Sequence, residues 1–161
     1  RSIRIHRMTG LLIALSLGSG APGGCDSIPM LNQQVIAFVN DHAGKRVGTG
    51  ECWDLAAEAL TKAGATRDGA YGFGKRVDPL KECVHPGDII RFQGVLLRQT
   101  TETSTHEERM SEHTAVIMEV KGSGMYRLGH QNMGTSGRKV GFSDIDVQYI
   151  VKGKYTIYRP Q

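Results

Sequence analysis

Residues 50–56 read Gly50-Glu51-Cys52-Trp53-Asp54-Leu55-Ala56, and this stretch begins a helix with a cysteine in its first turn. Apolar residues recur at helical spacing as far as Ala63, and Gly64 ends the helix. A thiol in the first turn lies near backbone N–H groups without intrahelical acceptors and near the positive end of the helix dipole, which favours the thiolate. Cys52 is therefore either a nucleophile or a small apolar residue at the edge of the buried helix face.

The length and charge of the chain indicate a single domain that does not bind nucleic acid. The 161 residues are enough for one core and leave little room for a second. There are 20 basic and 16 acidic residues, without a dense basic run after residue 7, so the clustered charge of a nucleic-acid-binding protein is missing. The formal charge of +4 favours an anionic partner such as a bacterial cell wall.

The N-terminus resembles an export signal. Three arginines in residues 1–7 precede an apolar run over residues 8–17, and small residues follow over residues 18–24. The apolar run is too short to span a bilayer, so we expect cleavage after transient membrane contact. We therefore predict an export signal and flexible segment over residues 1–28, a domain over residues 29–161, and a monomer that is secreted or in the cell envelope, in the periplasm or at the cell surface.

The odd number of cysteines leaves at least one thiol unpaired in an exported protein. If Cys52 is the free thiol, Cys25 and Cys83 can form a disulfide. Cys25 also follows small residues behind an apolar run, as a lipid-anchored cysteine does, although Pro22 replaces the apolar side chain expected three positions earlier. Cys25 is thus a disulfide partner, a lipid anchor or part of a removed tail.

The hydrophobic pattern predicts an α+β fold, with N-terminal helices packed on a small antiparallel β-sheet of about five strands. A first helix over residues 29–43 precedes the cysteine helix, and a long glycine-rich loop follows over residues 65–81. The polar segment 98–112 is expected to be an inserted loop. The predicted strands cover residues 89–92, 113–120, 125–130, 147–151 and 155–158.

The hairpin around Gly122 and Ser123 brings candidate catalytic residues together. A turn centred between these two residues places His113 opposite Asn132, with His130 diagonally adjacent, so that all three share one face of the sheet. Gln131 then points to the other face. The grouping depends on register, because a slip of one residue would break it.

A thiol nucleophile needs a base, and the base needs a third group that fixes its ring. Cys52, His113 and either His130 or Asn132 can fill these roles. The alternative is that His113 is a half-buried polar residue at the start of a strand. A zinc site is disfavoured, because the sequence has no short-spaced pair of cysteine or histidine ligands.

Four blocks resemble successive landmarks of the CHAP family, the cysteine, histidine-dependent amidohydrolases/peptidases, which belong with NlpC-type enzymes to a papain-like superfamily. They are Gly50-Glu51-Cys52-Trp53-Asp54-Leu55-Ala56, Pro86-Gly87-Asp88-Ile89-Ile90-Arg91-Phe92, His113-Thr114-Ala115-Val116-Ile117 and His130-Gln131-Asn132. The resemblance implies a papain-like fold with Cys52 as nucleophile and His113 as general base. His130 stands where the CHAP family commonly has an acidic residue, as in NlpC-type relatives, so the third member is His130 or Asn132.

The resemblance also implies a function. Backbone N–H groups at Glu51, Cys52 and Trp53 would surround the oxyanion and the substrate, with no metal and no cofactor, although we expect the Trp53 ring to pack in the core. The implied protein is an exported cysteine peptidase or amidase that cleaves peptidoglycan through an acyl-enzyme. The alternative is a catalytically inactive relative that binds a cell-wall peptide or glycan.

Overall fold

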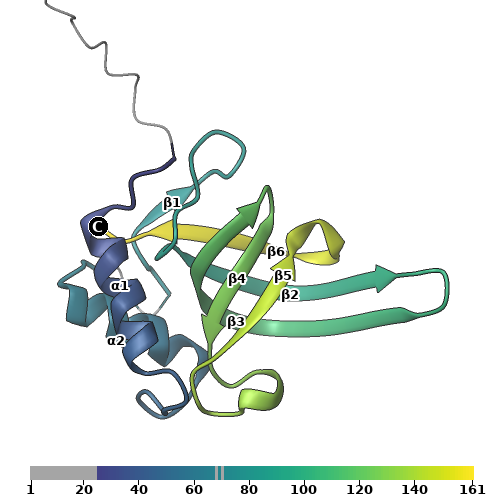
Figure 1. The fold of residues 1–161 in the computed structure, drawn as a ribbon, viewed down its shortest axis with the longest axis horizontal. Helices are drawn as coiled ribbons and strands as arrows, with labels where there is room; N and C mark the ends of the chain where they lie inside the picture. Colours follow the sequence, from purple (N-terminus) through teal and green to yellow (C-terminus); the bar gives the residue numbers. More distant parts are fainter. Residues whose placement is uncertain (1–24, 68, 70) are drawn as a thin grey trace, which may run out of the picture.

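Two helices pack on a six-stranded antiparallel sheet in the computed structural model, which describes residues 25–67, 69 and 71–161 (Figure 1). The strand order is β1-β6-β2-β3-β4-β5. The elements are α1 Met30–Asp41, α2 Cys52–Ala63, β1 Lys75–Val77, β2 Ile89–Thr100, β3 Thr105–Gly122, β4 Met125–His130, the 3₁₀ turn η1 Gly134–Ser136, β5 Gly141–Asp146, the 3₁₀ turn η2 Val147–Tyr149 and β6 Ile150–Arg159. The predicted α+β class is confirmed.

Most of the predicted export segment, residues 1–24, lies outside the described residues. Within the described residues, no helix has the length and apolar character needed to cross a membrane.

The two predicted helices are both present, and they form a first core with the sheet. Helix α2 begins at Cys52 and ends at Ala63, and Gly64 caps it with a φ of 75°, the left-handed conformation that glycine adopts readily. The buried face of α2 packs against α1 and against side chains of β2 and β3. This core includes Val35, Val39, Leu55, Ala56, Ala59, Leu60, Ile89 and Val116.

A second core lies among the alternate residues of the same strands. Its members include Ile90, Phe92, Ala115, Ile117 and Leu128. Because successive side chains of a strand point to opposite faces, His113 shares the face of Ala115, and His130 shares the face of Leu128. The alternation therefore places both histidines on one face of the sheet.

The prediction that residues 98–112 form an inserted loop is wrong. Strands β2 and β3 continue as a hairpin far beyond the sheet, and only residues 101–104 form the connection (Figure 1). Threonines favour strands, and pairs such as Thr100 with Thr105 and Arg98 with Glu107 face each other across the ribbon. Apart from the buried Met110, the residues of this segment are exposed or half-buried, so they lack an apolar alternation and resemble a loop in sequence.

The sheet has six strands where about five were predicted, and the positions of β1 and β5 were not anticipated. Strand β1 has only three residues, and β5 contains Ser143, Asp144 and Asp146, which are typical of loops. Both are edge strands that acquire their conformation from the neighbours β6 and β4. The segment predicted as a strand over residues 147–151 is instead the turn η2 followed by the start of β6, and β6 also contains the predicted strand 155–158.

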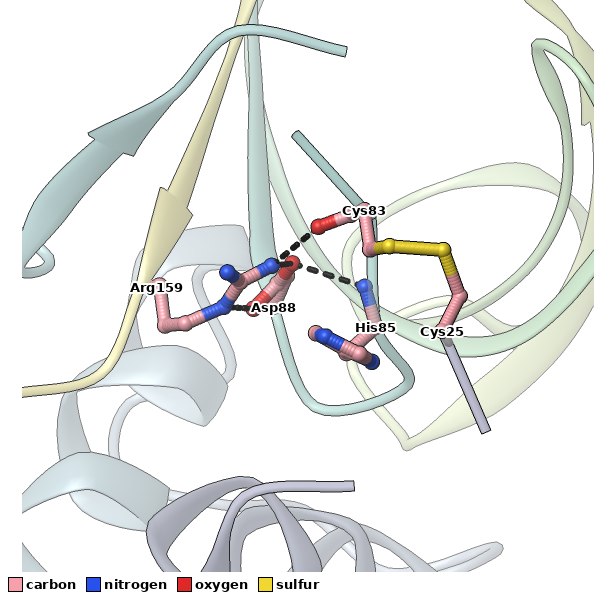
Figure 2. The surroundings of a disulfide bond; sticks show 5 residues. All are labelled: Cys25, Cys83, His85, Asp88 and Arg159. Carbon is pink, nitrogen blue, oxygen red and sulfur yellow. Dashed lines mark hydrogen bonds and ion pairs between the residues drawn. A yellow bond between two sulfur atoms is a disulfide. The ribbon is translucent and has the colours of Figure 1, made fainter. Parts of the chain in front are cut away.

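A buried ion pair and a disulfide connect the end of β6 and Cys25 to the turn before β2 (Figure 2). Arg159 donates to the carboxylate of Asp88 and to the carbonyl of Cys83. Cys83 is bonded to Cys25, so the disulfide predicted for the case of a free Cys52 is confirmed. A lipid thioether at Cys25 and this disulfide exclude each other, because both use the same sulfur atom.

Candidate functional site

Cys52 is the first residue of α2, as the sequence predicts, and its thiol is free and half-buried. At this position its backbone N–H belongs to the first turn, whose donors have no acceptor within the helix. No hydrogen bond reaches the Cys52 thiol from the part of the chain that the structure describes. Catalytic contacts are often loose without substrate, so this geometry leaves the predicted nucleophile role as a prediction.

Asp54 fixes the loop that leads into the cysteine. Its Oδ2 atom accepts hydrogen bonds from the Thr49 hydroxyl at 2.6 Å, the Thr49 backbone N–H at 2.7 Å and the Glu51 backbone N–H at 3.2 Å. The side chain is 7% exposed, so these bonds replace its lost hydration. The carboxylate satisfies donors that the first turn of α2 leaves free, and it thereby sets the direction in which α2 begins.

His113 and His130 are two predicted catalytic residues whose rings the structure brings into direct contact. Their ring centroids lie 5.3 Å apart, with the planes at 88°, and both side chains are buried. His130 Nε2 lies 2.9 Å from the Ser143 hydroxyl on β5. His113 Nε2 and His130 Nδ1 are buried without a hydrogen-bond partner among the described residues. Each of the two adjacent imidazole rings thus has a buried nitrogen without a hydrogen-bond partner.

Burial keeps both rings neutral near pH 7. Burial, with a smaller contribution from the charge of His130, lowers the pKa of His113 to about 4. Burial also lowers the pKa of His130 below its ordinary value. A neutral imidazole can accept a proton, so His113 has the protonation state that a general base requires.

The predicted register holds for the histidines and fails for Asn132. Val116 lies opposite Gly129 and Ile117 opposite Leu128, which places His130 on the diagonal from His113 as expected. The strand ends at His130, however, and Asn132 has a φ of 58°, so the chain turns away before it could pair with His113. The Asn132 amide instead donates to the Glu51 carboxylate at 2.8 Å.

Gln131 connects the histidine strand to the cysteine loop, a role that the sequence did not reveal. Its side-chain N–H groups donate to the carbonyls of Val47 at 2.8 Å and Glu51 at 2.9 Å, and its oxygen accepts from the Val47 N–H at 3.2 Å. Gln131 is fully buried. The residue after His130 is therefore bonded to the residue before Cys52. Gln131 does point away from the histidine face as predicted, but it points into the loop that leads to the nucleophile.

The two residues predicted to flank the oxyanion, Glu51 and Trp53, direct their side chains elsewhere. The Glu51 carboxylate lies 3.0 Å from the Arg138 guanidinium and also accepts from Asn132. Trp53 is 37% exposed and lines a surface groove with Phe38, so the prediction that its ring packs in the core is wrong. The buried face of α2 is occupied by leucine and alanine, which leaves the ring at the second position of the helix outside.

The described part of the chain contains no group of three His, Cys, Asp or Glu side chains arranged to hold a metal ion.

Known proteins resemble this chain in sequence or in structure. A protein of Debaryomyces hansenii, "Altered inheritance of mitochondria protein 3", is 27% identical over 149 residues, which cover 80% of this chain and 16% of that protein. The chain thus spans about a sixth of the length of this curated relative. Two crystal structures of Ly7917 are similar, at 18% identity with a TM-score of 0.47, and at 15% identity with a TM-score of 0.49. They cover 79% and 80% of this chain and 62% of each Ly7917 chain.

The family match covers nearly all of the described chain. Residues 30–161 match the family described as "AIM3/BBC1 Cysteine proteinase-fold domain", rather than the CHAP or NlpC-type families that the sequence resembles. The predicted papain-like fold is confirmed by this match. Neither the family match nor the relative supports a peptidoglycan substrate, a cell-wall location or secretion. The chain belongs to the AIM3/BBC1 cysteine proteinase-fold domain family.

Proposed function

We propose that this domain is a thiol hydrolase that cleaves an amide or ester bond through an acyl-enzyme on Cys52. The observation that supports this proposal is the hydrogen bond from Gln131 to the carbonyl of Glu51, because it joins the residue after His130 to the residue before Cys52. This link through Gln131 supports a common site for the free thiol at the start of α2 and the buried pair of imidazoles.

The hydrogen bond between His130 and Ser143 indicates which nitrogen of each histidine ring carries the proton. If the Ser143 hydroxyl accepts from the Nε2–H of His130, the Nδ1 of His130 is an acceptor. That acceptor suits an N–H on the buried Nε2 of His113, which leaves the Nδ1 of His113 free to take a proton. Ser143 would thereby select the tautomer in which His113 acts as a base.

The proposed reaction needs only these groups and water. His113 takes the thiol proton as the sulfur attacks the carbonyl carbon, and N–H groups at the start of α2 bind the developing oxyanion. The tetrahedral intermediate then collapses, and His113 returns the proton to the leaving amine or alcohol. Water attacks the thioester with His113 as base, which releases the acid and restores the thiol.

The test compares the wild-type chain with Cys52→Ala on three substrates: a fluorogenic peptide amide mixture, a p-nitrophenyl ester and purified peptidoglycan, the substrate that the CHAP resemblance implies. We expect turnover of at least one substrate and its loss in Cys52→Ala. Iodoacetamide should label Cys52 at one equivalent per chain, since the other two cysteines form a disulfide. Turnover that survives in Cys52→Ala would disprove the assignment.

A second candidate is a domain that binds a peptide or glycan without cleaving it. The low pKa of His113 favours this alternative, because it disfavours the imidazolium that would stabilise a thiolate. In that case the wild-type chain and Cys52→Ala would bind the same peptide with equal affinity in calorimetry, and neither would release a product.

The disulfide supports a secreted or cell-envelope location as a further part of the proposal. Disulfides persist mainly in oxidising compartments, and Cys25 with Cys83 forms one here. Mass spectrometry of the protein from its natural source, digested without reduction, should give the linked Cys25 and Cys83 peptides. Recovery of both peptides with free thiols would argue for a reducing compartment.

A further inference from the structure

A basic surface pocket of about 680 Å³ lies beside the loop that leads to Cys52. Its lining includes the cationic side chains of Arg46, Arg138 and Lys139 and the residues Thr135 and Ser136, and it contains no acidic residue. The volume falls within the range of roughly 300–1,000 Å³ that is usual for small-ligand sites.

Backbone hydrogen bonds between two loops build this pocket. The loop between α1 and α2 meets the loop between β4 and β5 at one edge of the molecule (Figure 1). The Gly44 N–H donates to the Val140 carbonyl at 2.9 Å, and the Val140 N–H donates to the Lys45 carbonyl at 2.8 Å. These bonds hold residues 44–46 beside residues 138–140, so the cations converge because the backbone is fixed.

Two of the three cations have no anionic partner among the described residues. Arg138 forms an ion pair with Glu51 at 3.0 Å and donates to the Thr49 carbonyl at 3.2 Å. Arg46 and Lys139 form no ion pair with any described side chain, and both are exposed. Unpaired cations beside hydroxyl groups repel one another, and a bound oxyanion would remove that repulsion while it accepts charge-assisted hydrogen bonds.

The pocket lies close to the nucleophile along the chain. A Cβ atom on Gly50 would lie 2.8 Å from the Cβ of Arg138 and 3.1 Å from the Cδ of Arg46, so these two residues flank Gly50. The Cα of Cys52 is two residues further on, at most about 7 Å away. Arg46 and Arg138 thus lie beside the segment that leads directly to the nucleophile.

We propose that this pocket binds an anionic oxygen group, a carboxylate or a phosphate, on the molecule that reaches Cys52. The pocket alone predicts anion binding, while the assignment of the anion to a substrate rests on the proposed function. It follows that the hydrolase prefers acyl substrates with a negative charge a short distance from the scissile bond, over neutral substrates of the same size.

The test uses the full chain and the double variant Arg46→Gln/Lys139→Gln. The control is Lys152→Gln/Lys154→Gln, which removes two exposed cations from β6 and changes the net charge equally. Calorimetric titration with sodium phosphate and with sodium acetate should show saturable binding to the wild type and the control, and at least tenfold weaker binding to the double variant. The two salts distinguish a tetrahedral anion from a planar one.

A second measurement relates the pocket to Cys52 without requiring turnover. The rate of alkylation by anionic iodoacetate, divided by the rate with neutral iodoacetamide, reports positive charge near the thiol. We expect this ratio to fall about threefold in the double variant and to stay constant in the control. Phosphate should slow the iodoacetate reaction of the wild type selectively.

The outcomes separate the two proposals. An unchanged rate ratio, together with no saturable binding of either salt, would overturn the pocket. A lower ratio and phosphate binding in a chain that hydrolyses nothing would uphold the pocket and overturn the hydrolase. Turnover with no preference for anionic over neutral substrates would overturn the assignment of the anion to the substrate.

Discussion

Arg159 holds the fully buried carboxylate of Asp88 through two hydrogen bonds, from Nε to Oδ1 at 3.1 Å and from Nη2 to Oδ2 at 2.8 Å. The same carboxylate accepts from the Asn32 side chain on α1 at 2.8 Å and from the His85 backbone N–H at 2.9 Å. Four donors around one carboxylate compensate for its burial. The last residue of β6 thereby fixes α1 and the turn that starts β2.

Arg159→Met should destabilise the domain strongly, because it leaves the Asp88 carboxylate buried without its cation. We expect the free energy of unfolding to fall by about 3–5 kcal/mol, measured by urea titration at pH 7. The control Arg98→Met removes a pair with Glu107 in which both side chains are substantially exposed, and it should cost less than about 1 kcal/mol. Equal effects of the two substitutions would show that burial does not determine the contribution of this pair.

Gln131→Ala should loosen the loop before Cys52. The substitution leaves the Val47 N–H and the carbonyls of Val47 and Glu51 without their partner, and we expect a loss of about 3 kcal/mol in the free energy of unfolding. Hydrogen exchange at the Val47 amide should accelerate. Asn132→Gly is the matched control, since it removes one exposed hydrogen bond to Glu51 while glycine tolerates the left-handed φ of 58°, and it should cost less than about 1 kcal/mol. Unchanged hydrogen exchange at the Val47 amide in Gln131→Ala would show that Gln131 does not hold the loop before Cys52.

The sequence was sufficient for the helices, the strand of His113 and the diagonal position of His130, because hydrophobic periodicity and a short turn determine them locally. It was insufficient for Gln131, since one polar residue between His130 and Asn132 carries no periodic signal and its partners lie 80 and 84 residues away. Asn132 was misplaced for a related reason. The predicted register assumed that β4 continues, whereas the chain turns at Asn132, which has a left-handed φ of 58° and donates its side-chain amide to Glu51.

The stability of the domain should decrease on acidification because of His113. Its pKa is about 4 in the folded protein and about 6.5 in the unfolded chain, so the unfolded chain binds more protons between these values. The contribution of His113 to the free energy of unfolding is therefore complete above pH 6.5. It is lost as the pH falls towards 4, and the total loss is about 3 kcal/mol.

Urea unfolding between pH 7 and 4.5 measures this effect. His113→Gln should flatten the pH dependence, whereas the control His106→Gln, at an exposed position of β3, should retain it. A wild-type slope in His113→Gln would assign the pH dependence to other groups, of which His130 is the first candidate because its pKa is also lowered by burial.

The third member of the site should be His130 rather than Asn132. The His130 ring contacts the His113 ring edge to face, whereas the Asn132 amide is bonded to Glu51, so only His130 is placed to orient the base. We expect His130→Gln to lower kcat about 100-fold with little change in KM, and Asn132→Ala to change kcat by less than about threefold. Ser143→Ala should give an intermediate loss, because it removes the partner that selects the His130 tautomer. Thermal unfolding of each variant separates loss of catalysis from loss of structure. If Asn132→Ala removes turnover while His130→Gln retains it, Asn132 must move to His113 when substrate binds, and the edge-to-face histidine pair is then a packing contact.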